Sequence, residues 1–274
     1  MIDNPLRQYF RRPGLYLKIP STGRYYPAGA LDLPENKELP VFPMTAIDEI
    51  TSKTPDALFN GSAVVDIIKS CVPNIRDPWG LPMMDLDPIL LGIRAATSGN
   101  TMDVDSTCPA CNETSTYELN LISILGKLTP GNYDEPVQLG DLKFKFKPLS
   151  YRTVNSVNTT QFEIEVALKN LDAVTDENVK ITQSKAAMVK LRDLSMTILS
   201  AAIEYIETPE SKVESSEHIQ DFLRNCDATR YKLIRETITK LRETTELKPS
   251  PVKCPECQHE FEQRVVINVS DFFG

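Results

Sequence analysis

Two cysteine pairs constrain this chain more than any other feature of its sequence. Each pair is a Cys-Pro-x-Cys segment, formed by Cys108 and Cys111 and by Cys254 and Cys257. Two thiolates spaced in this way on a tight turn can bind one metal ion from the same side, and a second such turn completes four sulfur ligands. We therefore predict one structural zinc site with these four cysteines as ligands, and iron in the same shell stays open.

The flanking residues indicate that both pairs lie at the tips of β-hairpins, because strand-forming runs surround them. In such a turn the residue after the second cysteine takes a left-handed backbone, which suits Asn112 better than Gln258. The competing interpretation is a redox dithiol or structural disulfides, but neither pair begins a helix-periodic apolar run, so zinc is favoured. Cys71 and Cys226 have no second cysteine at the spacing that metal ligands require. We expect Cys71 to be buried as a small apolar residue.

Composition narrows the class of protein and of partner. The chain has 274 residues and a formal net charge of −8, which argues against broad attraction to nucleic acid or anionic lipid. No apolar run approaches the roughly 20 residues of a membrane span, so none is expected. Because the paired cysteines are expected to bind metal as thiolates, we expect the chain to fold in a reducing cytoplasm. The expected partners are proteins, and a homo-oligomer stays open.

The sequence pattern divides the chain into four parts and predicts an α+β fold. A mixed helical N-terminal region precedes a small zinc-ribbon-like β module, and a large helical insert lies between the two cysteine turns. The expected parts are an extended Pro-rich N-terminal arm at 1–44, a small helical subdomain at 45–100, the β module at 101–149 and 248–274, and the helical insert at 150–247. The alternative for the N-terminal part is a loop-rich cap over the chain's own core.

Three local predictions follow from capping and periodicity. Asp87 and Pro88 are typical of a helix start, and Gly99 of its end. The alternating run 137–147 predicts a strand near the metal hairpins. In the insert, an apolar helix face from Ala186 to Ile206 is expected to pack on a seam from Tyr231 to Leu241, or on a neighbouring molecule.

Catalytic signals are scarce. The two histidines are His218 and His259. We expect His218 to be a solvated residue in the first turn of a helix. We expect His259 to lie near the metal site without binding the ion, because four cysteines already complete the ligand shell. Phosphate-binding, dinucleotide-binding, serine-hydrolase and zinc-protease motifs are all absent from the sequence. We therefore expect no enzyme and no small-molecule substrate.

Several segments of the first 110 residues resemble one family of phage proteins. They are Asn4–Tyr16, Phe42–Ile50, Thr54–Gly61, Ser70–Pro73 and Met84–Asp87. On these residues the chain is similar to the baseplate hub and hub-assembly proteins of T4-like contractile-tailed bacteriophages. The resemblance implies a non-enzymatic structural or assembly protein whose partners are other baseplate and tail proteins. It also implies a location in the virion tail baseplate, and in the host cytoplasm during assembly.

Two alternatives to a hub component follow from the same residues. One is a hub-assembly chaperone that is absent from the mature particle. The other is a zinc-ribbon nucleic-acid-binding protein, which should carry Lys and Arg interleaved with aromatic residues around the cysteine turns. Acidic residues dominate there instead, including Asp103, Asp105, Glu113 and Glu118, so no nucleic acid is expected.

Overall fold

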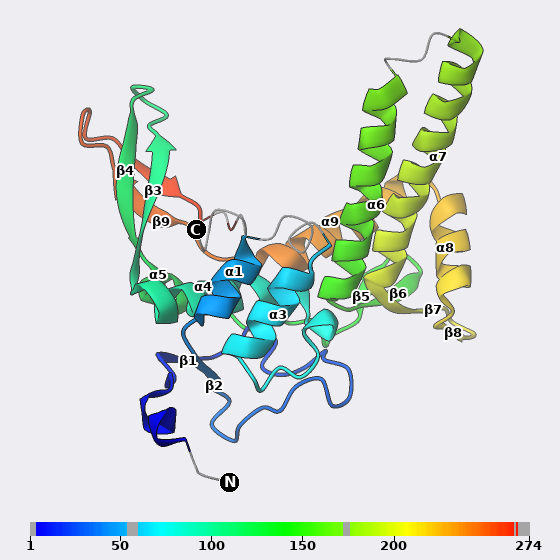
Figure 1. Ribbon diagram of the computed structural model, residues 1–274. Helices are drawn as coiled ribbons and strands as arrows, with labels where there is room; N and C mark the ends of the chain where they lie inside the picture. The colour runs from blue at the N-terminus through cyan, green and yellow to red at the C-terminus, as the bar shows by residue number, and fades with distance from the viewer. Residues whose placement is uncertain (1–3, 54–59, 172–175, 266, 268–274) are drawn as a thin grey trace. The chain divides into compact units, whose positions relative to one another are not determined.

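The computed structural model describes residues 4–53, 60–171, 176–265 and 267. The remaining positions lie outside the described residues, and they include the start of the expected arm, part of the Thr54–Gly61 segment and the end of the β module. Helices and small antiparallel sheets alternate along the chain (Figure 1), which confirms the predicted α+β class. The chain forms two compact units. Unit 1 comprises 1–78, 84–130 and 245–274, and unit 2 comprises 79–83 and 131–244.

Unit 1 has a helical core and two β-hairpins that carry the cysteines. Its described elements are η1 (Pro5–Tyr9), β1 (Leu15–Leu17), β2 (Leu39–Val41), α1 (Ala46–Ser52), α3 (Ser62–Cys71), most of α4 (Met83–Ser98), β3 (Thr101–Thr107), β4 (Thr114–Asn120), α5 (Leu121–Leu125), β9 (Ser250–Lys253) and β10 (Glu260–Gln263). Helix α1 begins with a capping box, in which Thr45 and Asp48 satisfy each other's backbone N–H groups. The apolar side of α3, including Ile67 and Ile68, is fully buried.

The start of α4 differs from the prediction. The helix begins at Met83, and Pro88 lies inside it. The structural reason is burial: Met84 and Leu86 precede the proline on the core side of the helix, so their apolar contacts extend it toward the N-terminus. Gly99, with φ of 99°, follows the helix as predicted.

The expected N-terminal arm is packed on unit 1 over much of its length, so this prediction needs correction. Leu17, Leu39 and Val41 are at most 3% exposed. Gly92 on α4 lies so close that a Cβ there would meet Leu17 at 3.4 Å. Strands β1 and β2 pair antiparallel and lie against this helix. The sequence pattern does not indicate this packing. A strand of three residues is too short for alternating apolar and polar residues to reveal which face is buried.

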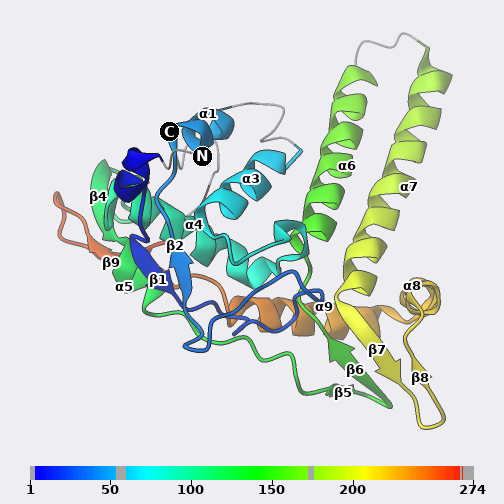
Figure 2. The same cartoon turned by 60° about the horizontal axis from the view of Figure 1, so that its bottom comes forward.

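Unit 2 combines a four-stranded antiparallel sheet with a long helical hairpin (Figure 2). The sheet order is β5–β6–β7–β8, and helices α6 and α7 run side by side beyond it. The elements are β5 (Val137–Leu139), β6 (Leu142–Phe146), α6 (Tyr151–Asn170), α7 (Glu177–Ala201), β7 (Ile203–Glu207), β8 (Lys212–Val213), α8 (Ser216–Asn225) and α9 (Ala228–Glu243). Phe144 and Phe146 fill its core at no more than 2% exposure.

Two predictions for this part of the chain are wrong. The strand at 142–146 pairs with β7 in unit 2, rather than joining the metal hairpins. The apolar run to Ile206 is helical only as far as Ala201, because Ile203 and Ile206 enter the sheet opposite Phe146 and Phe144. Helix α7 packs on α6 and α8. Among the described residues, no helix is both long and apolar enough for a membrane crossing.

Candidate metal centre

The two cysteine pairs lie at the tips of two hairpins in unit 1. Cys108 and Cys111 join β3 to β4, and Cys254 and Cys257 join β9 to β10. The hairpins lie side by side in Figures 1 and 2. Between them Tyr117 of β4 meets Phe261 of β10 edge to face, with ring centroids 5.7 Å apart. This contact holds the two tips toward one another.

Both turns have the same backbone hydrogen bonds. The N–H of Cys108 donates to the carbonyl of Glu113 at 2.9 Å, and the N–H of Cys254 donates to the carbonyl of His259 at 2.9 Å. Each turn closes with a further bond from Asn112 or Gln258 to the first cysteine's carbonyl. The φ angles of these two residues are 59° and 61°. The predicted left-handed backbone at both positions is therefore confirmed.

The four sulfurs lie within 4.8 Å of one another. Across the hairpins, the Sγ atoms of Cys108 and Cys257 are 3.6 Å apart, and those of Cys111 and Cys254 are 3.7 Å apart. A tetrahedral ion with metal–sulfur bonds of about 2.3 Å requires sulfur separations of about 3.8 Å. A disulfide requires about 2.05 Å, and all four cysteines are free thiols. The arrangement can hold one metal ion.

The surroundings of the sulfurs stabilise a thiolate at Cys254 and disfavour one at Cys111. The N–H groups of Cys257 and Glu256 donate to the sulfur of Cys254 and lower its pKa to about 7, with the first as the largest cause. The N–H of Glu113 lowers the pKa of Cys111, but burial and the other sulfurs outweigh it and raise that pKa to about 12. One thiolate therefore disfavours a second beside it, and a cation would be needed to stabilise all four.

His259 lies beside the cysteines without joining them. Its ring stacks on Phe261 at 6.3 Å with an interplanar angle of 10°, while the described group of potential ligands consists of the four cysteines. Its backbone N–H donates to the sulfur of Cys257. Such an N–H bond orients a ligand and is typical of the surroundings of metal-bound thiolates.

The other two cysteines, Cys71 and Cys226, are not part of this group of potential ligands. Cys71 is fully buried at the end of α3, as predicted. Burial, as the largest cause, raises the pKa of its thiol to about 11. Next to it, the guanidinium of Arg11 donates to the carbonyl and hydroxyl of Ser70 and lies 3.4 Å from a carboxylate oxygen of Asp48.

A second polar cluster in unit 1 was missed from sequence. Asp85 on α4 is fully buried and accepts hydrogen bonds from the backbone N–H and hydroxyl of Ser21 and from the hydroxyl of Tyr26. These hydrogen bonds hold Ser21 and Tyr26 against α4. Ser21 and Asp85 are 64 positions apart, so no local sequence pattern indicates that they meet.

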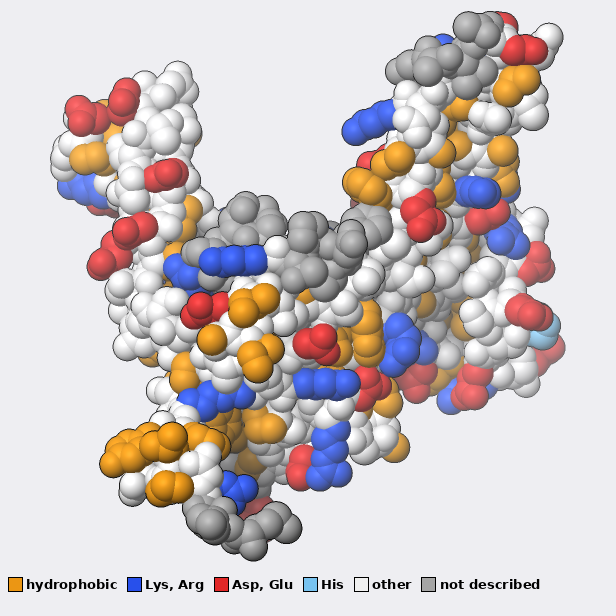
Figure 3. All heavy atoms as spheres, viewed as in Figure 1, with side chains coloured by type: hydrophobic (Ala, Val, Ile, Leu, Met, Phe, Trp, Pro, Cys, Tyr) orange, Lys and Arg blue, Asp and Glu red, His pale blue; other side chains and the backbone are white. Residues whose placement is uncertain are grey.

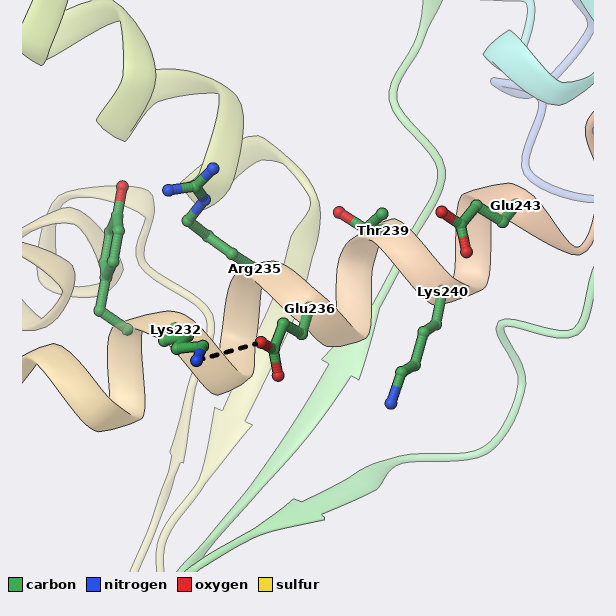
Figure 4. Close-up of a pocket in the computed structure, with 7 residues that line it drawn as sticks. Lys232, Arg235, Glu236, Thr239, Lys240 and Glu243 are labelled. Carbon is green, nitrogen blue, oxygen red and sulfur yellow. Dashed lines mark ion pairs between the residues drawn. The ribbon is translucent and has the colours of Figure 1, made fainter.

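An open groove of about 820 Å³ runs along α9 in unit 2 (Figure 4). Its charged lining is paired locally: Lys232 lies 3.8 Å from Glu236, and the guanidinium of Arg235 lies over the ring of Tyr231. The lining residues also include Thr239, Lys240 and Glu243.

Comparison with known proteins adds one finding. The family model described as T4 bacteriophage base plate protein matches residues 31–274. The match covers all four cysteines and reaches into both compact units. No curated protein and no solved structure matches the chain significantly.

Proposed function

The chain belongs to the T4 bacteriophage base plate protein family, and we propose that it acts at the baseplate hub of a contractile tail. Membership in the family gives it a structural or assembly role in the phage baseplate, with other tail proteins as partners. The family match over residues 31–274 is the observation that carries this proposal. The resemblance of the first 110 residues to hub and hub-assembly proteins supports the assignment to the hub.

The proposed role is non-enzymatic and depends on protein–protein contacts. A shell of four thiolates leaves no open coordination position for water or substrate, which is the arrangement of structural sites. We assign Zn²⁺ to Cys108, Cys111, Cys254 and Cys257, because soft thiolates in a tetrahedron of this size suit zinc. When bound, the ion would join two hairpins that are far apart in sequence.

The charges near the metal centre disfavour the nucleic-acid alternative. Acidic residues with exposed side chains surround both cysteine turns, namely Asp103, Asp105, Glu113, Glu118, Glu256, Glu260 and Glu262, against Lys253 and Arg264. A backbone of phosphates would be repelled by this surface. Proteins are therefore the proposed partners, in the assembling cell and in the tail of the particle.

The test is quantitative mass spectrometry of purified virions and of baseplate assembly intermediates. A hub component should be present in virions in a fixed ratio to known baseplate proteins. An assembly chaperone should be abundant in intermediates and absent from virions. Loss of the chain should leave particles without complete hubs in either case. Normal, infectious particles in its absence would contradict both roles.

A further inference from the structure

The phenol of Tyr117 is a buried polar group beside the candidate metal centre. Tyr117 lies in β4, opposite Val104 of β3, and is 8% exposed. Its ring packs edge to face on Phe261 of the other hairpin. The hydroxyl is buried, and no atom of the described residues stands at hydrogen-bonding geometry to it. Buried polar groups are seldom left without a partner, so this hydroxyl requires an acceptor.

The neighbours that affect the ionisation of this hydroxyl are Ser115 and two of the sulfurs. Burial, as the largest cause, raises the pKa of Tyr117, and the charge of the Cys254 sulfur raises it next. The same sulfur raises this pKa further as a hydrogen-bond acceptor, whereas the hydroxyl of Ser115 lowers it, as a donor does. The O–H of Tyr117 therefore lies beside the sulfur of Cys254 without being aligned on it.

A filled cluster of four thiolates requires hydrogen-bond donors. Four thiolates outnumber the charges of one divalent ion, so the cluster stays negative when the ion is bound. Figure 3 shows acidic side chains on the surface of the two hairpins, which lie at the upper left in this view, and these add to the negative charge. A further donor inside the module would stabilise the cluster. The backbone N–H groups that donate to the sulfurs are those of Glu256 and Cys257 to Cys254, of Glu113 to Cys111 and of His259 to Cys257.

We propose that Tyr117 is a positioning residue of the metal centre, whose O–H donates to the sulfur of Cys254 when the four thiolates hold an ion. The proposal rests on the zinc assignment made above. Tyr117 belongs to the β3–β4 hairpin and Cys254 to the β9–β10 hairpin, so the bond crosses from one hairpin to a ligand of the other. It fixes the position of this sulfur and lowers its tendency to give up electrons, as hydrogen bonds to metal-bound thiolates do.

The first test compares the electronic absorption of the cobalt-substituted full-length chain with that of its Tyr117→Phe variant. The substitution keeps the aromatic ring and removes the O–H alone. The thiolate-to-cobalt charge-transfer bands should move to longer wavelength, because a sulfur without the hydrogen bond gives up its electrons more easily. Tyr16→Phe is the matched control, since it makes the same chemical change at a residue of unit 1 that is 63% exposed. Its bands should coincide with those of the wild type.

The second test measures the transfer of zinc to a chelator. Tyr117→Phe should lose its zinc at a chelator concentration about tenfold lower than the wild type does, because a hydrogen bond to a charged acceptor is removed. Fluorotyrosine at position 117 has a more acidic O–H and is a stronger donor. It should therefore retain zinc more firmly and move the charge-transfer bands in the opposite direction, with almost no change in packing.

The outcomes separate this proposal from the zinc assignment. Unchanged bands and unchanged zinc transfer in Tyr117→Phe would overturn the role of Tyr117 and leave the zinc assignment standing. A wild-type chain that binds neither cobalt nor zinc would overturn both. Band shifts in opposite directions for Tyr117→Phe and for fluorotyrosine would support the hydrogen bond, because a merely structural role of the ring would not produce them.

Discussion

The sulfurs of Cys108 and Cys257 lie 3.6 Å apart although the two residues are 149 positions apart in the chain. The first belongs to the β3–β4 hairpin and the second to the β9–β10 hairpin, and residues 131–244 of unit 2 lie between them in the chain. A metal ion shared by the two hairpins would therefore close a very long loop. Closing such a loop removes much conformational freedom from the unfolded chain.

The first prediction concerns the ligands. Replacing any one of Cys108, Cys111, Cys254 or Cys257 by Ser should damage the β module to a similar extent, because each change leaves three ligands on a site built for four. Metal binding of this kind contributes on the order of 10 kcal/mol to folding of a small module. Chemical unfolding and hydrogen exchange of the β3–β4 and β9–β10 amides measure the effect.

Cys226→Ser is the matched control, because Cys226 is half-buried and lies in unit 2. It should leave metal content and the stability of the β module unchanged. If a ligand variant exchanged its hairpin amides as slowly as the control, the four cysteines would not share an ion.

The second prediction concerns the left-handed residue of the second turn. Gln258→Val should lower the stability of the metal-bound module by about 1–2 kcal/mol, because a β-branched residue is strained at a φ of 61°. Gln258→Gly should have a smaller effect, since glycine removes the strain but also the side-chain bond to the Pro255 carbonyl. Metal competition with a chelator measures both. Equal affinity in the Val and Gly variants would contradict the proposed backbone role.

The third prediction is a pH dependence caused by Asp85. Burial, as the largest cause, raises the pKa of this carboxyl to about 6, above its ordinary value of 3.8. The folded protein therefore holds the proton more tightly than the unfolded chain does. The resulting stabilisation is fully present below about pH 4 and is lost as pH rises through about 6. It amounts to something on the order of 3 kcal/mol.

Urea unfolding of the wild type and of Asp85→Asn across pH 4 to 7 isolates this contribution. The difference in unfolding free energy between the two proteins should change with pH over that range and level off above it. A difference that is the same at every pH would show that Asp85 does not titrate in this way.

The fourth prediction separates the core of unit 2 from its surface. Ile203→Lys should destabilise the isolated protein by several kcal/mol, because Ile203 is 2% exposed and an unpaired charge would be buried there. Leu233→Lys is the matched control, since Leu233 is 44% exposed, and it should change stability by about 0.5 kcal/mol or less. Similar thermal unfolding of the two variants would refute the assignment of Ile203 to the core.

The fifth prediction concerns the N-terminal residues that remain exposed. Leu6, Tyr9 and Phe10 are between 59% and 77% exposed, whereas Arg11 is held by Ser70 and Pro43. Deleting residues 1–10 should therefore leave thermal stability nearly unchanged but weaken incorporation into baseplate complexes, because exposed aromatic residues are typical anchors of interfaces. Deleting residues 1–26 should destabilise unit 1. If the shorter deletion assembled normally, the exposed N-terminal residues would not be a docking element.

The cysteine turns could be predicted from sequence because their chemistry is local. The spacing inside each pair and the left-handed positions at Asn112 and Gln258 follow from a turn of a few residues. A helix over the residues that follow Ala186 was likewise predicted from apolar periodicity, and α7 runs to Ala201. The α+β class follows from the mixture of these signals.

The remaining features depend on contacts between distant residues. Strand β6 gives an alternating pattern, but its pairing with β7 joins Lys143 to Glu207, far along the chain, and no local signal specifies that partner. The burial of Asp85 depends on Ser21 and Tyr26 in the same way. The helix prediction failed beyond Ala201, where Ile203 and Ile206 lie in β7, because apolar runs suit a buried helix and a sheet equally well.

X-ray absorption at the zinc edge, on protein made in a reducing cytoplasm, tests the central claim most directly. The account predicts one zinc per chain, surrounded by four sulfur atoms at about 2.3 Å and no nitrogen or oxygen ligand. Protein that contains no bound metal and yet unfolds with its full native stability would contradict the account. A zinc ion with fewer than four sulfur ligands would contradict it as well.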